Sequence, residues 1–157
     1  MKDDLSGIAI DTDTVWVIEG SYDLAGVLRA LPWLVPADST LYFEGTAMDE
    51  AVSALLARFP AAHATEVFPG TILPEPRRFH VAFREELIGS LILLSKQLAE
   101  PELCDHFHVY RGGRVLLAGY DFVFMPLVLP ASFPEEAVRE FAVRIGCAYR
   151  LRPAAET

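Results

Sequence analysis

Hydrophobic positions follow two periods along the first half of the chain, and the alternation predicts strands interleaved with helices. Residues 14–19 and 40–44 are rich in β-branched and aromatic side chains, which is typical of strands. Each run is followed by apolar residues three and four positions apart, so each predicts a helix with one buried face, ended by Pro32 and by Pro60. The helix positions are Leu24, Val27, Leu28 and Leu31, then Val52, Leu55, Leu56 and Phe59.

The second half repeats the alternation in the order strand, helix, strand, strand, helix, strand. The strands are expected at 79–83, 103–111, 114–120 and 147–151. One helix has Glu85 and Glu86 in its first turn, and the other is started by a capping box of Ser132 and Glu135. This order is that of split βαβ folds. We therefore expect an α/β (α+β) two-layer sandwich, with a ferredoxin-like βαββαβ half over residues 79–151 and an N-terminal βαβα extension. Residues 122–129 are a further candidate strand.

Length and composition favour one folded domain over residues 1–157. The chain has 157 residues, of which 52% are hydrophobic and 22% charged, and this excludes disorder and coiled coils. The proline-rich residues 60–77 are the best candidate for a subdivision. The mean hydropathy of +0.29 indicates either a large core or an apolar surface that needs a partner.

Charge narrows the class of partner. With 22 acidic and 13 basic residues the net charge is −9, which repels nucleic-acid backbones and attracts a basic protein. The longest uncharged run, residues 122–134, is too short and too rich in proline to span a membrane, and no signal peptide is evident. We expect a cytoplasmic protein in which Cys104 and Cys147 stay reduced.

Candidate chemistry lies on the strand at 103–111, which Gly112 and Gly113 join to the next strand. Both glycines are expected to take positive φ in a two-residue hairpin turn. Alternation then puts Cys104, His106 and His108 on one face of the sheet, with Asp121 opposite Cys104 across the hairpin. Cys104, His106, His108 and Asp121 are therefore the candidate site residues.

This cluster has three interpretations. The pair His106 and His108 can supply two metal ligands, with Cys104 or Asp121 as the third. Alternatively, Cys104, His106 and Asp121 can act as nucleophile, base and orienting carboxylate. The third interpretation is a solvated sheet face without chemistry. Because neither Cys-x-x-Cys nor His-Glu-x-x-His occurs, we expect no metal and no cofactor. His80 is expected to lie two strands from His108, too far to share an ion.

Three runs resemble a family of uncharacterised small bacterial proteins with no assigned activity. They are residues 41–46, 69–71 and 101–117. The resemblance implies a bacterial origin and a single domain, and it carries over no site residues.

We expect the protein to act by binding, because no catalytic or phosphate-binding motif occurs. Its partner would be another protein, and if that partner is basic, binding would neutralise or regulate it. The partner could also be a second copy of the chain, bound through an apolar surface. The first alternative is a metal-assisted or thiol-dependent enzyme that uses the Cys104 cluster. The second is a small-ligand binder that uses a cleft between the two halves of the chain.

Overall fold

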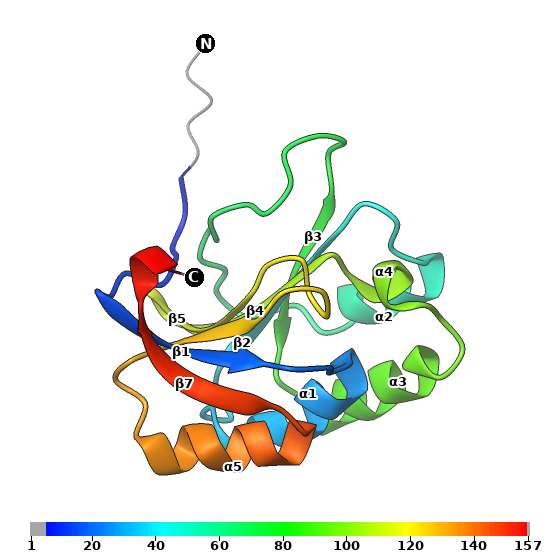
Figure 1. The fold of residues 1–157 in the computed structure, drawn as a ribbon. Coiled ribbons are helices and arrows are strands. Elements are labelled where there is room, and N and C mark those ends of the chain that lie inside the picture. The colour runs from blue at the N-terminus through cyan, green and yellow to red at the C-terminus, as the bar shows by residue number, and fades with distance from the viewer. Residues whose placement is uncertain (1–5, 157) are drawn as a thin grey trace.

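The computed structural model describes residues 6–156, which form a mixed α/β fold around one antiparallel sheet of seven strands (Figure 1). The strands are β1 (Thr14–Glu19), β2 (Thr40–Gly45), β3 (Arg77–Ala82), β4 (His106–Arg111), β5 (Arg114–Gly119), β6 (Leu127–Pro130) and β7 (Ala148–Pro153). They lie in the order β3-β2-β4-β5-β6-β1-β7. The alternation of strands and helices expected from the sequence is confirmed.

Helices cover one face of this sheet, and the main core lies between them and the strands (Figure 1). Within residues 6–156 the α-helices are α1 (Leu24–Ala30), α2 (Glu50–Ala57), α3 (Glu85–Ser95), α4 (Glu100–Leu103) and α5 (Glu135–Ile145), with short 3-10 helices at Leu31–Trp33 and Ala154–Glu156. Phe43, Phe107 and Val109 face these helices and are fully buried. None of the described helices has the length and apolar composition needed to cross a bilayer.

The ferredoxin-like arrangement of the second half is not what the structure has. That arrangement would place β7 beside β3, whereas β7 pairs with β1 and β3 pairs with β2, at opposite edges of the sheet. The reason is that the two N-terminal strands enter the sheet instead of extending it. β2 lies between β3 and β4, and nearly all of its side chains are buried, as expected for an interior strand. Strands from both sides of residues 60–77 thus share one sheet.

The start of β4 also differs from the expected strand. Pro101 does not end a long helix; it lies in the first turn of α4, where its missing N–H and fixed φ are tolerated. Cys104 is the C-cap of this short helix, and the strand begins only at His106. Cys104 is therefore buried in the main core instead of standing in the row of polar strand residues.

The hairpin between β4 and β5 is confirmed, but its turn and register differ in detail. Only Gly112 has positive φ, at 58°, so Gly113 has no special conformational requirement. A register irregularity between Val109 and Tyr110 shifts the pairing by one residue, and His108 faces Ala118. An extra residue on one strand of a pair produces such a shift, which the spacing of the glycines does not reveal.

The second face of the sheet is covered by irregular segments instead of helices. Ile8 pairs in parallel with Val67, so the segment around Ile8 and residues 66–68 run side by side over this face. Tyr42, Tyr110 and Val67 form a small second core there, packed against residues from β5 and β6. Polar side chains that point away from the helices consequently become buried.

Candidate functional site

His106 and His108 lie on the same face of β4, as their spacing predicts, but that face is not solvated. Their exposed fractions are 3% and 1%, respectively. The covering segment makes direct contact: a Cβ added to Gly70 would lie 2.4 Å from the His106 ring. The interpretation as a solvated face is wrong, because Gly70 and Thr71 contact His106, and Tyr42 and Tyr120 pack against His108.

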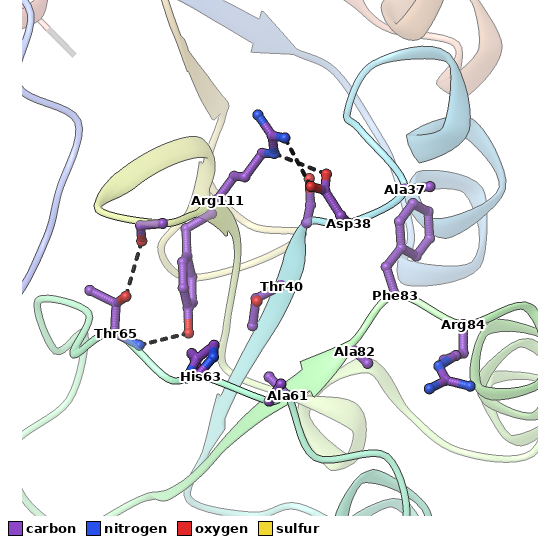
Figure 2. A pocket seen from close by; sticks show the side chains of 14 residues that line it. Ala37, Asp38, Thr40, Ala61, His63, Thr65, Ala82, Phe83, Arg84 and Arg111 are labelled. Carbon is purple, nitrogen blue, oxygen red and sulfur yellow. Dashed lines mark hydrogen bonds and ion pairs between the residues drawn. The ribbon is translucent and has the colours of Figure 1, made fainter.

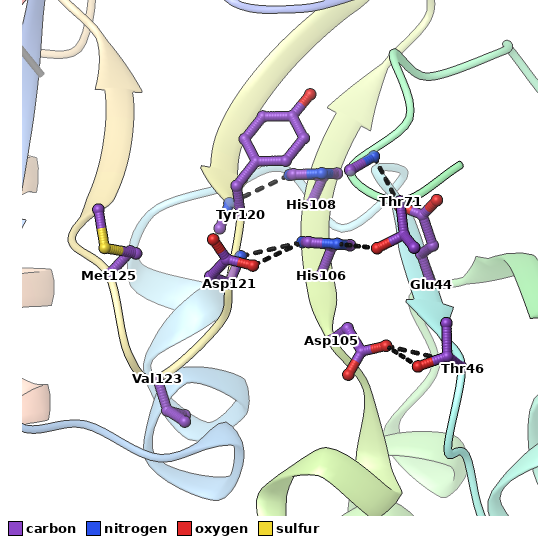
Figure 3. Close-up of polar contacts among 12 residues, drawn as sticks. Glu44, Thr46, Thr71, Asp105, His106, His108, Tyr120, Asp121, Val123 and Met125 are labelled. Atoms are coloured by element: carbon purple, nitrogen blue, oxygen red, sulfur yellow. Dashed lines mark hydrogen bonds and ion pairs between the residues drawn. The ribbon is translucent and has the colours of Figure 1, made fainter. Parts of the chain in front are cut away.

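Backbone hydrogen bonds fix the protonation of both rings. The N–H of Gly119 donates to His108 Nδ1 at 3.1 Å, and the N–H of Asp121 donates to His106 Nδ1 at 2.9 Å (Figure 3). A backbone N–H can only donate, so both Nδ1 atoms accept, and the ring proton of each histidine is on Nε2. The Nε2 atom of His106 therefore donates to Thr71 Oγ1, at 2.8 Å.

His108 is surrounded by aromatic rings. It stacks on Tyr42 at 5.7 Å between ring centroids and contacts Tyr120 at 4.4 Å. Burial, followed by the nearby His106, lowers the pKa of His108 to about 3, so this ring is neutral at physiological pH. Its Nε2 atom makes no hydrogen bond to any described residue.

Glu44 is a buried acidic residue of this region that sequence reasoning missed. Its carboxylate is completely buried, with Oε1 3.3 Å from Arg78 Nε and Oε2 accepting the N–H of Gly70 at 3.0 Å. Arg78 also donates to the carbonyl of Thr71, at 3.3 Å. Glu44, Arg78 and His106 thus hold residues 70–71 against the sheet. The sequence signal was an acidic residue inside an otherwise apolar strand.

Three of the four predicted site residues line one cavity. It has a volume of about 340 Å³ and lies between the start of β4, the loop after β5 and residue 71. Its lining comprises Cys104, His106 and Asp121 with Thr46, Thr71, Pro101, Asp105, Phe122 and Phe124. His108 does not reach this cavity. Asp105 accepts hydrogen bonds from the N–H and the hydroxyl of Thr46, both at 2.8 Å, a pairing that the strand pattern did not indicate.

Nucleophilic catalysis does not fit the protonation of this cluster. Burial raises the pKa of the Cys104 thiol, which opposes formation of the reactive thiolate. Thr71, His106 and Asp121 have the outline of a hydroxyl–imidazole–carboxylate triad, but the Asp121 carboxylate is 4.0 Å from Nδ1. Because Nε2 carries the proton, His106 has no free position with which to accept one from Thr71.

Metal ligation was the other chemical interpretation of the cluster. Among the described residues no group of three or more histidine, cysteine and acidic side chains lies close enough to hold one ion. Cys104 belongs to the main core, and the Nδ1 atoms of both histidines are already hydrogen-bonded. The geometry therefore gives the metal interpretation no support.

A tight loop after β5 forms one rim of the cavity. Asp121 and Val123 both have positive φ, 47° and 69°, which is costly for a β-branched residue. Tyr22 fixes the loop through two hydrogen bonds: its hydroxyl accepts the N–H of Val123 and donates to the carbonyl of Met125. The loop leaves Phe124 75% exposed beside the cavity.

A second cavity of about 470 Å³ lies where residues 37–40, 61–65 and 82–84 meet (Figure 2). Residues from both halves of the chain line it, and the small-ligand alternative expects a cleft between the two halves. Arg111 and Asp38 form a two-pronged ion pair on one side, with both distances 2.9 Å. Tyr110 accepts the N–H of Thr65 at 3.0 Å. Arg84 also lines this cavity and has no ion-pair partner among the described residues, so the cavity differs in charge from the one beside His106, which no lysine or arginine lines.

Comparison of the chain with protein-family models, with curated proteins and with solved structures finds no match in any of the three. The assignment of function therefore rests on the geometry of the site.

Proposed function

We propose that the protein acts by binding in the cytoplasm, and that the cavity beside His106 receives a cationic side chain of a basic protein partner. One observation carries the proposal: two carboxylates, Asp105 and Asp121, line the same cavity, and no lysine or arginine lines it. The remaining polar side chains of the lining are the hydroxyls of Thr46 and Thr71, the Cys104 thiol and the His106 imidazole, whose Nδ1 accepts a backbone N–H, so the site is net negative.

Both carboxylates retain capacity for a ligand. The hydrogen bonds from Thr46 end on Oδ2 of Asp105, and within the described residues Oδ1 accepts none. The side chain of Asp121 is 71% exposed. Its Oδ1 atom lies 4.0 Å from His106 Nδ1, which is longer than a hydrogen bond. A guanidinium group can donate to two carboxylates at once through its fixed fork of N–H groups.

The rim supplies the apolar part of the contact. Phe124 is exposed at the mouth, and Met125 beside it is 51% exposed. A cation that enters the cavity can pass over the ring of Phe124, where a cation–π contact contributes about 0.5–1 kcal/mol at an exposed site. The net charge of −9 adds long-range attraction for a basic partner.

A fluorescein-labelled tetra-arginine peptide tests the proposal by fluorescence anisotropy at low ionic strength. The double variant Asp105→Asn/Asp121→Asn should bind more than about tenfold more weakly than the wild type, which corresponds to about 1.4 kcal/mol. A matched variant, Glu136→Gln/Glu140→Gln on α5, removes the same charge from residues that do not line the cavity and should bind within about twofold of the wild type.

The uncharged analogue tetra-citrulline separates cation recognition from peptide binding in general. It should show no binding at concentrations that saturate the arginine peptide. Equal binding of both peptides, or equal losses in the two double variants, would contradict the proposal.

A further inference from the structure

The outer face of α3 is apolar at its centre and charged at its two ends. Glu85, Gly89, Ile92 and Lys96 are four, three and four residues apart and form one stripe, with exposed Leu93 beside it. Leu87 and Leu91 on the opposite side are fully buried. The stripe therefore faces outward, on a helix that packs between α1 and α2.

An apolar groove of about 540 Å³ runs beside this stripe. It lies between α1 and α3, its apolar lining includes Leu28, Pro32, Ile88 and Ile92, and its two charged lining residues are Arg29 and Glu85. A Cβ added to Gly89 would meet no atom within 4 Å, so the groove is open at that residue. Leu93, immediately beside it, is 62% exposed. The surface thus presents both an apolar projection and a depression.

We propose that this face is the interface of a homodimer, in which α3 packs antiparallel against α3 of a second copy. Suppose that a twofold axis relates the two copies and passes between residues 90 and 91 of each α3. The number of each residue and the number of the residue that it faces in the other copy then add up to 181. Glu85 then faces Lys96, and Gly89 faces Ile92. Leu93 faces Ile88. Opposite charges meet at both ends, and a large side chain meets a glycine at the centre.

Charge complementarity selects a second copy as the occupant. Within the described residues neither Glu85 nor Lys96 has an ion-pair partner in its own chain, whereas the neighbouring Glu86 pairs with Arg58 at 3.5 Å. The two unpaired charges are separated by eleven residues, or about 16 Å along a helix. Antiparallel packing satisfies both in each chain, as a twofold interface requires.

The seam is short, so the dimer should be weak. Stable interfaces bury about 800 Å² on each partner, and a single pair of three-turn helices supplies less. We expect a dissociation constant on the order of micromolar, which becomes larger at high salt because two ion pairs contribute. Sedimentation equilibrium between 1 µM and 1 mM should show the full-length chain changing from monomer to dimer.

Charge reversal tests the orientation. Glu85→Lys and Lys96→Glu should each weaken dimerisation at least tenfold, because like charges then meet twice. The double variant Glu85→Lys/Lys96→Glu should restore it, since opposite charges meet again. Glu136→Lys on α5 is the matched control and should leave the dimer unchanged. Circular dichroism checks that each variant is folded.

Several outcomes would overturn the proposal. These are a wild-type chain that stays monomeric at 1 mM, a double charge reversal that fails to restore the dimer, or a Leu93→Asp variant that dimerises as well as the wild type. A monomer at all concentrations would leave the face open to a foreign partner. The interface shares no residue with the cavity beside His106, so its failure and that of the cation site are distinguishable.

Discussion

Gly70 lies at the point where the irregular segment 60–71 contacts the sheet, and Gly70→Ala tests whether that contact is tight. A Cβ at this position would lie 2.4–2.5 Å from three atoms of the His106 ring. The ring cannot turn away freely, because Asp121 holds one of its nitrogens and Thr71 the other. Forcing an extra methyl group into a packed site costs about 1–3 kcal/mol, and losing the bond to Thr71 costs about 1 kcal/mol more.

The free energy of unfolding of Gly70→Ala should therefore fall by about 2–4 kcal/mol, which corresponds to a decrease in melting temperature of about 4–16 °C for a chain of this size. Urea denaturation followed by circular dichroism measures it. The control is Gly113→Ala, where the added Cβ meets no atom within 4 Å, and it should stay within about 0.5 kcal/mol of the wild type.

A double-mutant cycle with His106→Ala locates the cause. Once the ring is removed, Gly70→Ala should cost less than about 0.5 kcal/mol, because the added methyl group then has space. If Gly70→Ala is neutral in the wild type, or equally costly with and without His106, the packing described for this segment is refuted.

Three further predictions use the same thermodynamic and chemical measurements. Gly112→Ala should lower the free energy of unfolding by about 1–2 kcal/mol, since Gly112 has φ 58°; an unchanged urea midpoint would show that the turn relaxes. The pKa of His108 is about 3 in the folded protein and about 6.5 when unfolded, so the unfolded state binds the extra proton. Stability should thus fall as the pH drops from about 6.5 towards 3, by up to about 1.4 kcal/mol per unit, and His108→Asn should flatten this slope between pH 6 and 5. Finally, only Cys147 should react with a thiol reagent in the native protein, and Cys104 should react once the protein unfolds. Equal rates for both thiols in the native protein would contradict the burial of Cys104.

Local patterns predicted the elements well because their causes are local. The period of the apolar residues located the strands and helices, and the i, i+2 spacing put His106 and His108 on one face. Gly146 shows this at a single residue. It follows the apolar stripe of α5, which predicts a C-cap, and it ends the helix in the left-handed conformation with φ 73°.

Features that depend on distant contacts could not be predicted in this way. β2 pairs with strands that follow it by more than thirty residues, and nothing in its own sequence specifies those neighbours. The burial of His106 depends on residues 60–71, which have no periodicity to indicate where they pack. Asp105 and Thr46 are 59 positions apart and meet only because β2 and β4 are adjacent.

The central claim is that Asp105 and Asp121 together bind a cation, and mapping of amide chemical shifts tests it most directly. Titration of ¹⁵N-labelled protein with tetra-arginine should shift the amide signals of Thr46, Asp105 and Asp121 together, with one affinity. Tetra-citrulline should leave them in place. Shifts confined to acidic residues elsewhere, such as those of α5, or an absence of shifts at the cavity while the peptide binds, would contradict the account.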